Sequence, residues 1–167
     1  MTDPYFITPY RAVEAFETFV LPGIKKAMND GAVGRRHMHI VCLRPNTPYS
    51  EKAGLPILFD HSIGDPEDWQ QWEGKSYKDF AQAKARISWR TGMSSREVVM
   101  CQPHLLVKSD TILWGSSILN GVIVAVSGVQ PYFDEMFATM TAAAVIGEAS
   151  HYAHEFQTKE NRPDFLE

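Results

Sequence analysis

The stretch Gly121–Val122–Ile123–Val124–Ala125–Val126–Ser127–Gly128, with Gln130–Pro131–Tyr132–Phe133–Asp134–Glu135 shortly after it, decides the fold of the second half of the chain. Consecutive apolar residues with no polar alternation predict a central strand over 122–126 that is covered on both faces. Asn120–Gly121, just ahead of this run, is the strongest hairpin-turn signal in the chain. Pro131 stands where a helix begins, so we expect a long helix over 131–157.

Local signals place the other elements around this strand. Helical spacing and capping residues predict helices at 8–29, interrupted at Pro22–Gly23, at 76–91 and from 94 onward, with a short helix at 65–68 that carries Trp69 and Trp72. Apolar runs predict further strands at 37–43, 55–59, 104–107 and 111–114. Because tight turns join antiparallel strands, we expect an α+β fold, a five-stranded antiparallel sheet flanked by helices.

Length and composition narrow the class of protein. The 167 residues predict a single domain over 1–167. A formal net charge of −4 argues against a nucleic-acid or anionic-membrane surface, which needs clustered Lys and Arg. No apolar run approaches the roughly 18 residues of a membrane span, and the first residues lack a signal-peptide pattern, so we expect a cytoplasmic protein. Cys42 and Cys101 lie in apolar segments and predict buried free thiols, with a disulfide as the alternative.

Three segments of the second half resemble one protein family. Ser76–Tyr77–Lys78–Asp79–Phe80–Ala81–Gln82–Ala83–Lys84–Ala85 resembles a Ser-x-x-x-x-Ala-x-x-Lys-Ala helix, and Gly121–Gly128 resembles a Gly-x-x-x-(Gly/Ala)-Val-Ser-Gly strand. Asp134–Glu135 falls where the family has Asp-Glu at the start of its last helix. The family is the one that contains GlcG, the haem-binding HbpS proteins and the C-terminal domain of PduO. The resemblance covers roughly residues 74–150.

The resemblance implies a profilin-like fold with α/β/α layers. Members of the family usually form homo-oligomers, and they bind haem or iron or have no assigned activity. The chain departs from the family in two expanded segments, 44–54 and 60–74, and in Trp114–Gly115–Ser116–Ser117, which replaces a Gly-Gly. We expect both expansions to lie at the ligand pocket, so the resemblance leaves the identity of the ligand open. No histidine in the first helix matches a haem ligand.

Lys84 is the most informative candidate for chemistry. It lies in the stripe that Phe80, Ile87 and Thr91 define on the helix over 76–91. A lysine on an inward stripe is costly to desolvate unless it meets an anion. The expected partners are Asp134, Glu135 or a substrate carboxylate, and the alternative is a side chain that extends its ammonium to the surface. Ser127 and Gly128 are candidate ligand-binding residues at the corner after the central strand.

Two groups of histidines are candidate metal or haem ligands. His151 and His154, with Glu148 beside them, share a face of the last helix with Met140, which predicts an inward metal site for iron, haem iron or zinc. The alternative is a histidine pair that complements the helix C-terminus. His37 and His39 alternate on one strand and so share a face, where they are candidates for binding metal. The arginines before them are candidates for binding haem propionates. The alternative is an edge strand with a polar face.

Asp60 and His61 form the remaining candidate group, near Trp69, which is a candidate ligand-binding residue. A carboxylate and an imidazole suit general acid–base catalysis, although neighbouring strand residues point to opposite faces of a sheet. The alternative is a surface loop without a catalytic role.

Two hypotheses for function follow. The first is a homo-oligomeric protein that binds haem or another planar or carboxylated small molecule at a subunit boundary. The second is a small cofactor-free enzyme, an isomerase, hydrolase or lyase that acts on a small organic acid through Lys84, His61 and Asp60. The expanded, Trp- and Asp-rich region favours the second, because loops on a rigid scaffold usually carry specificity. The absence of a Soret shift on adding hemin, together with a deep, dry pocket around Lys84, would distinguish it from the first.

Overall fold

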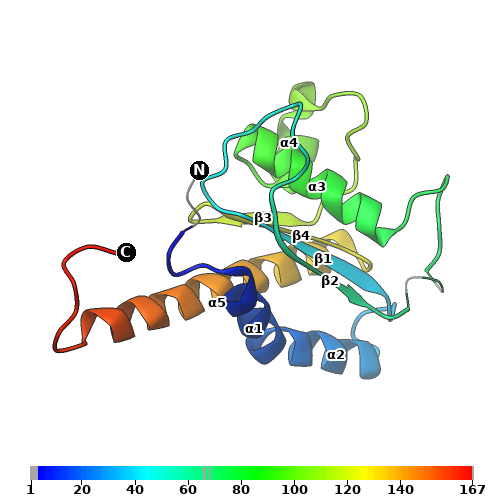
Figure 1. Ribbon diagram of the computed structural model, residues 1–167. Helices are drawn as coiled ribbons and strands as arrows, with labels where there is room; N and C mark the ends of the chain where they lie inside the picture. Colours follow the sequence, from blue (N-terminus) through cyan, green and yellow to red (C-terminus); the bar gives the residue numbers. More distant parts are fainter. Residues whose placement is uncertain (1–3, 66, 68, 167) are drawn as a thin grey trace.

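The computed structural model describes residues 4–65, 67 and 69–166. Figure 1 shows helices packed on both faces of a small sheet. The elements in chain order are α1 (Pro9–Phe19), α2 (Leu21–Asn29), β1 (Met38–Leu43), β2 (Ile57–Ile63), α3 (Tyr77–Thr91), α4 (Ser95–Cys101), the 3₁₀ turn η2 (Pro103–Leu105), β3 (Ser116–Leu119), β4 (Val122–Ser127) and α5 (Pro131–Gln157).

The sheet is antiparallel, as expected, but it has four strands among the described residues rather than five. The strand order is β2-β1-β4-β3, so β1 and the apolar β4 are central. Helices α1, α2 and α5 cover one face, and α3 and α4 cover the other (Figure 1). The α+β class and the α/β/α layering are therefore confirmed, and the number of strands was wrong.

The difference in strand number arises at 104–114. The first two residues of the expected strand at 104–107 lie in a 3₁₀ turn that begins at Pro103, which has no N–H to donate to a sheet. The carboxylate of Asp110 accepts a hydrogen bond from the Val107 backbone N–H at 2.9 Å, and the Thr111 hydroxyl accepts one from Leu113 N–H at 3.1 Å. These local bonds satisfy the backbone without a partner strand. The actual third strand is β3, the first arm of the hairpin.

The turn between β3 and β4 follows the sequence signal directly. Asn120 and Gly121 both have positive φ, 46° and 81°, as the two central residues of a type I′ turn require. Thr8 caps α1 by accepting a hydrogen bond from Arg11 N–H. The interruption expected at Pro22–Gly23 is a complete break between α1 and α2, which falls at Val20 because Pro22 lacks the N–H that would continue the ladder.

Three expectations about segments change. β2 runs to Ile63, so residues 60–63 belong to the sheet rather than to an expanded loop. The helix expected at 65–68 includes positions 66 and 68, which lie outside the described residues. Cys42 and Cys101 are both free thiols, but only Cys42 is buried, and burial raises its pKa to about 12.

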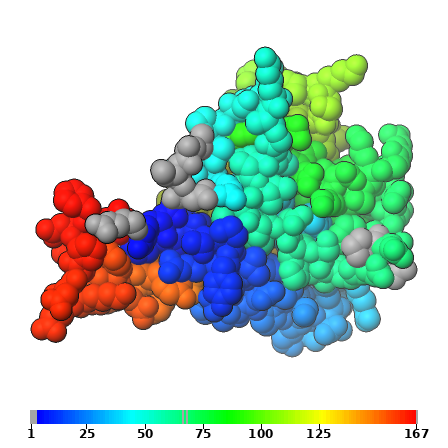
Figure 2. Space-filling model, in the orientation of Figure 1, coloured from blue at the N-terminus to red at the C-terminus, as the bar shows by residue number. Residues whose placement is uncertain are grey.

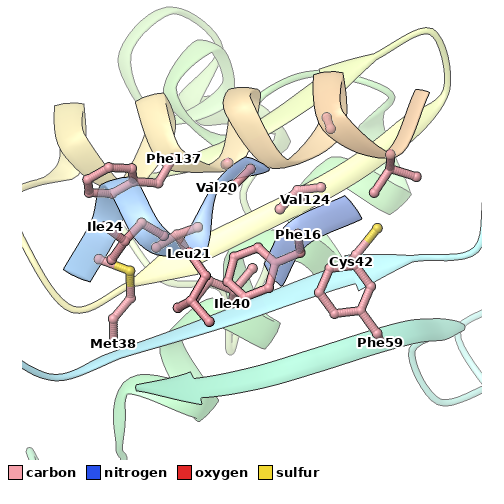
Figure 3. Packing of buried hydrophobic residues seen from close by; sticks show 14 of the residues in the cluster. Phe16, Val20, Leu21, Ile24, Met38, Ile40, Cys42, Phe59, Val124 and Phe137 are labelled. Carbon is pink, nitrogen blue, oxygen red and sulfur yellow. The ribbon is translucent and has the colours of Figure 1, made fainter. Parts of the chain in front are cut away.

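The main core lies on the α1, α2 and α5 side of the sheet. Phe16 and Ile24 from the helices pack there against Ile40, Val124 and Phe137 (Figure 3). A smaller cluster on the other side joins the strands to α3: Val41, Leu43, Ala81, Ala85, Trp89 and Ala125. In the space-filling view, the C-terminal end of α5 and the residues after it project from this body (Figure 2).

Candidate functional site

A pocket of about 340 Å³ lies where α3, the end of β4 and the start of α5 meet. Its lining includes the expected residues Lys84, Ser127, Gly128 and Asp134. Aromatic walls and a second cation complete it: Trp72, Tyr77, Phe80 and Arg35. The volume lies in the range of small-molecule sites.

Lys84 is buried, with 1% of its surface exposed. It lies on the face of α3 that packs against the sheet, together with Ala81, Ala85 and Ser88. Its ammonium donates one hydrogen bond to Asp134 Oδ2 and one to the Val126 carbonyl, each at 2.8 Å. The expected partnership with an anion is therefore present.

Of the two carboxylates considered for Lys84, only Asp134 reaches it. Asp134 lies in the first turn of α5 and faces the sheet, whereas Glu135 lies on the outer side. The Glu135 carboxylate instead pairs with the guanidinium of Arg96, at 2.9 Å. Glu135 therefore lies outside the described lining of this pocket.

The second oxygen of Asp134, Oδ1, accepts a hydrogen bond from Val129 N–H at 3.1 Å. Burial raises the pKa of Asp134 to about 6, although the Lys84 ammonium opposes the shift. Burial likewise lowers the pKa of Lys84, and Asp134 opposes that change. Both shifts favour the neutral pair, and pairs of this kind in a cleft are typical of functional sites.

Gly115 covers this pair and was not among the predicted site residues. A Cβ atom at this position would lie 2.5 Å from Asp134 Cβ and 3.0 Å from Lys84 Nζ. Its φ of +144° is also one that side-chain-bearing residues rarely adopt. The backbone can therefore approach Lys84 and Asp134 this closely only because residue 115 is glycine. In the sequence, Gly115 is the one glycine in Trp114–Gly115–Ser116–Ser117, where the family has Gly-Gly, and no role was inferred for it.

The aromatic side of the pocket comes from α3 and the turn before it. Trp72 packs edge-on against Tyr77 and Phe80, with ring centroids 5.3 and 5.9 Å away. Arg35 donates a hydrogen bond to the Tyr77 hydroxyl at 3.4 Å, and its Cζ lies 5.8 Å from the centre of the Trp72 ring. The arginines before β1 were expected to meet a ligand carboxylate, and Arg35 is the one in the lining. Sequence reasoning missed Tyr77.

The expanded segment 44–54 does not contribute to this pocket. Thr47 accepts a hydrogen bond from the Trp89 indole, and Tyr49 packs edge-on against the same ring. Trp89 lies three turns of α3 beyond Tyr77, which is about 18 Å at 1.5 Å per residue. The segment 44–54 is therefore absent from the described lining of this pocket, whereas the segment 60–74 supplies Trp72.

His39 lies on the α3 side of the sheet but is absent from the described lining. It is buried, its Nδ1 is hydrogen-bonded to the Ser62 hydroxyl at 3.0 Å, and its Nε2 lies 3.4 Å from Asp60 Oδ2. Trp69 packs edge-on against its ring. Burial lowers the pKa of His39 to about 4, so the imidazole is neutral at pH 7. His39 therefore lies between Ser62 and Asp60, but none of the three residues lines a described pocket.

His61 and His37 lie apart from this group. His61 points to the opposite face of the sheet from Asp60 and packs 5.1 Å from the Phe16 ring centre. Burial lowers its pKa. The ring of His37, which precedes β1, lies against the backbone of Gly64. The structure therefore does not bring Asp60, His61 and Lys84 into one site.

The prediction that His151 and His154 point inward at the C-terminal end of α5 was wrong. His151 and His154 are exposed, with 58% of the His151 side chain accessible, and Glu148 is half-buried. Met140, expected on the same inward face, is also exposed. The residues that face the core lie earlier in the helix: Asp134, Phe137, Ala138, Thr141, Ala142 and Val145. Among residues 4–65, 67 and 69–166, no three His, Cys, Asp or Glu side chains converge as a metal site.

Comparison with known proteins supports the fold. No protein-family model matches the chain, and no curated protein matches its sequence. The structure is similar to the crystal structure of an HbpS variant from Streptomyces reticuli with two Glu-to-Asp substitutions. The two align with a TM-score of 0.54 and 20% identity, over 86% of this chain and 89% of that one. The chain therefore has an HbpS-like fold, as the resemblance implied.

None of the helices in the described part of the chain combines the length and the apolar character that crossing a bilayer demands.

Proposed function

We propose that this protein binds a small, planar, carboxylated molecule in the pocket between α3, β4 and α5. The observation that carries the proposal is the composition of one pocket: aromatic walls, the Arg35 guanidinium and the buried Lys84–Asp134 pair. Ligand sites combine a largely apolar lining with a few placed polar groups in this way.

The charges of the pocket favour a ligand with one negative group. Lys84 and Asp134 neutralise each other, so they contribute no net charge. Arg35 is exposed and is not ion-paired with any described carboxylate in the structure. A guanidinium binds a carboxylate through two parallel hydrogen bonds, and the rings of Trp72 and Phe80 supply surfaces on which a planar ligand can stack.

Haem belongs to this class of ligand, and the HbpS-like fold makes it the first compound to test. The aromatic walls suit a porphyrin face, and Arg35 suits a propionate. No histidine, cysteine or methionine is among the described lining residues. Tyr77 lines the pocket, and tyrosine is a residue type that holds haem iron in other proteins. Bound haem would supply a redox-active iron.

The proposal also includes self-association and a cytoplasmic location. The family resemblance implies a homo-oligomer, and α5 exposes Tyr132, Met136 and Met140 on the side that borders β3. Light scattering during size-exclusion chromatography tests this, because a monomeric mass would contradict it. A reducing cytoplasm would keep the exposed thiol of Cys101 free.

Ligand titration tests the pocket. We expect hemin or aromatic carboxylates to quench tryptophan fluorescence through Trp72, with a shifted Soret band in the case of hemin. Arg35→Gln should weaken binding about tenfold, the worth of one charge-assisted hydrogen bond. The matched control is Arg36→Gln, which changes the neighbouring exposed arginine outside the lining. Equal affinity in both variants would contradict the proposed site.

A second candidate function is a cofactor-free enzyme for a small organic acid. The observation in its favour is that Lys84 is buried at the pocket beside Asp134, and that burial shifts the pKa values of both groups toward neutrality. General acid–base catalysis near pH 7 needs groups with pKa values adjusted in this way.

A further inference from the structure

We propose that Lys84 forms a Schiff base with the carbonyl carbon of a 2-oxo acid whose carboxylate is bound by Arg35. The inference rests on the proposed function, because it requires a carboxylated ligand in the same pocket. It goes further by naming a covalent step, its nucleophile and the class of substrate.

Lys84 differs from every other lysine of the chain. The others are exposed to solvent, whereas Lys84 is buried and still lines a pocket. An exposed lysine stays protonated and hydrated, and is therefore a poor nucleophile. A desolvated lysine loses its proton more readily, which is how amines that form Schiff bases are activated.

The contacts of the ammonium leave room for the reaction. Lys84 Nζ donates to Asp134 Oδ2 and to the Val126 carbonyl, so two of its three N–H bonds have partners among the described residues. Asp134 is held in place independently by the Val129 N–H. A proton that leaves Lys84 therefore has an acceptor 2.8 Å away that does not need to move.

The proton balance closes within this pair. Lys84 passes one proton to Asp134, and the neutral amine attacks the carbonyl carbon. A C–N bond forms, the carbonyl π electrons move to oxygen, and that oxygen takes a proton from the nitrogen. Asp134 then returns its proton to the hydroxyl group, which leaves as water. The product is a protonated imine beside an ionised Asp134, and no oxidant or reductant is required.

The lining defines the substrate class. Arg35 requires a carboxylate, Lys84 requires a carbonyl carbon, and the rings of Trp72 and Phe80 favour an aromatic or planar substituent. A stabilising role alone does not account for the ion pair, because buried ion pairs are often no more stabilising than apolar residues of the same size. An aryl 2-oxo acid meets all three requirements.

Borohydride trapping tests the step. We would incubate the protein with phenylglyoxylate and sodium cyanoborohydride and locate the reduced adduct by peptide mass spectrometry. The expected result is one adduct, on Lys84, that forms at least tenfold more slowly in Asp134→Asn. Lys84→Arg should abolish it, and Lys78→Arg, which changes an exposed lysine of the same helix, should leave it unchanged.

Mandelate separates this inference from the proposed function, because it has the ring and the carboxylate but no carbonyl. Binding of mandelate and phenylglyoxylate without a trapped adduct would overturn the Schiff base and leave the binding function intact. Binding of neither compound would count against both. Adducts spread over surface lysines would also overturn the inference. If Lys84→Arg does not fold, the neutral double variant Lys84→Met with Asp134→Leu takes its place.

Discussion

The two faces of the sheet are made by the same strands and yet have opposite characters. On β1, Ile40 and Cys42 face α1 and α5 and join the main apolar core, whereas His39, between Met38 and Ile40, faces α3 and is hydrogen-bonded to Ser62. On β4, Val126 packs in the main core and Ser127 lines the pocket. Alternation along a strand lets one set of residues stabilise the fold while the next set carries polar groups.

The α3 face is itself divided. One group of residues, Val41, Ala81, Ala85 and Trp89, forms a small apolar cluster, whereas Lys84, which lies between Ala81 and Ala85 along α3, lines the pocket with Asp134. The two charges buried here, the Lys84 ammonium and the Asp134 carboxylate, are paired with each other, since an unpaired buried charge is very costly. The comparison predicts that substitutions on the two faces will differ in how they can be rescued.

The largest expected effect compares Phe16→Ala with Lys84→Met. Each should lower the free energy of unfolding by about 3–5 kcal/mol, the first by leaving a cavity and the second by leaving Asp134 buried and unpaired. Chemical denaturation measures both.

Rescue distinguishes the two faces. Adding Asp134→Leu to Lys84→Met should restore most of the lost stability, because it removes the uncompensated charge. Adding Asp134→Leu to Phe16→Ala should lower stability further, because it leaves Lys84 buried and unpaired and the losses at separate sites add. If the first double variant is as unstable as its parent, Lys84 is stabilising for reasons other than its charge.

The pH dependence of stability should report His39. The pKa of this imidazole is about 4 in the folded protein against 6.5 in the unfolded chain, so the unfolded chain binds more protons between these values. This group therefore contributes stability that is present above pH 6.5 and is lost as the pH falls to about 4. The loss amounts to about 3 kcal/mol.

His39→Gln isolates this contribution. Asp134 acts in the opposite direction, because its raised pKa adds stability at low pH that is lost as the pH rises through about 6. That contribution is common to wild type and variant and cancels in their difference. The difference in unfolding free energy should therefore shrink steadily from pH 7 to pH 4. A constant difference would show that His39 is not neutral and buried in solution.

Gly115→Ala is expected to cost about 2–3 kcal/mol, because the new Cβ would clash with Asp134 and the backbone angle is unfavourable for alanine. Gly31→Ala is the matched control on the other side of the molecule. Its φ is also positive, at 74°, but nothing lies within 4 Å of the added Cβ. We expect the control to cost about 1 kcal/mol. Equal losses in thermal or chemical denaturation would rule out the clash at the pocket.

The smallest effect compares two buried hydroxyl groups. The Ser116 hydroxyl, on the α3 face, accepts a hydrogen bond from Ser95 N–H at 2.8 Å and is also bonded to Ser88. Ser116→Ala leaves those partners unsatisfied and should cost about 1–2 kcal/mol. Thr141 bonds only to the Phe137 carbonyl of its own helix, so Thr141→Val should cost less than about 1 kcal/mol. The reverse order would contradict the assignment of the polar network to the α3 face.

Elements with strong local signals were predicted well. Asn120–Gly121 dictates its own turn, and Ser76 and Asp79 form a capping box at the start of α3. The apolar run of 104–107 was taken for a strand because apolar periodicity does not register the competing side-chain bonds of Asp110. β3 was missed because its first residues, Ser116 and Ser117, are polar. They can be buried because their hydroxyl groups form hydrogen bonds with hydroxyl groups that are distant in the sequence.

The candidate site was predicted in part. Helical spacing placed Lys84 on an inward stripe, which is a local property of α3. The same reasoning failed for His151 because the apolar residues of α5 surround the helix on all sides, so spacing alone did not reveal which face meets the sheet. His39 and Asp60 were predicted in separate candidate groups, and only the pairing of β1 with β2 brings them to a distance of 3.4 Å, from Nε2 to Oδ2.

The sequence by itself determined the hairpin, the central strand and the capped helices, because each depends on residues a few positions apart. It also determined that a lysine would need an anion. Only the tertiary structure decided that the anion is Asp134, fifty residues away, that Gly115 closes over the pair, and that Tyr77 and Arg35 border the same pocket. These facts depend on how α3 and α5 cross the sheet, and the packing of the whole core sets that geometry rather than any local pattern.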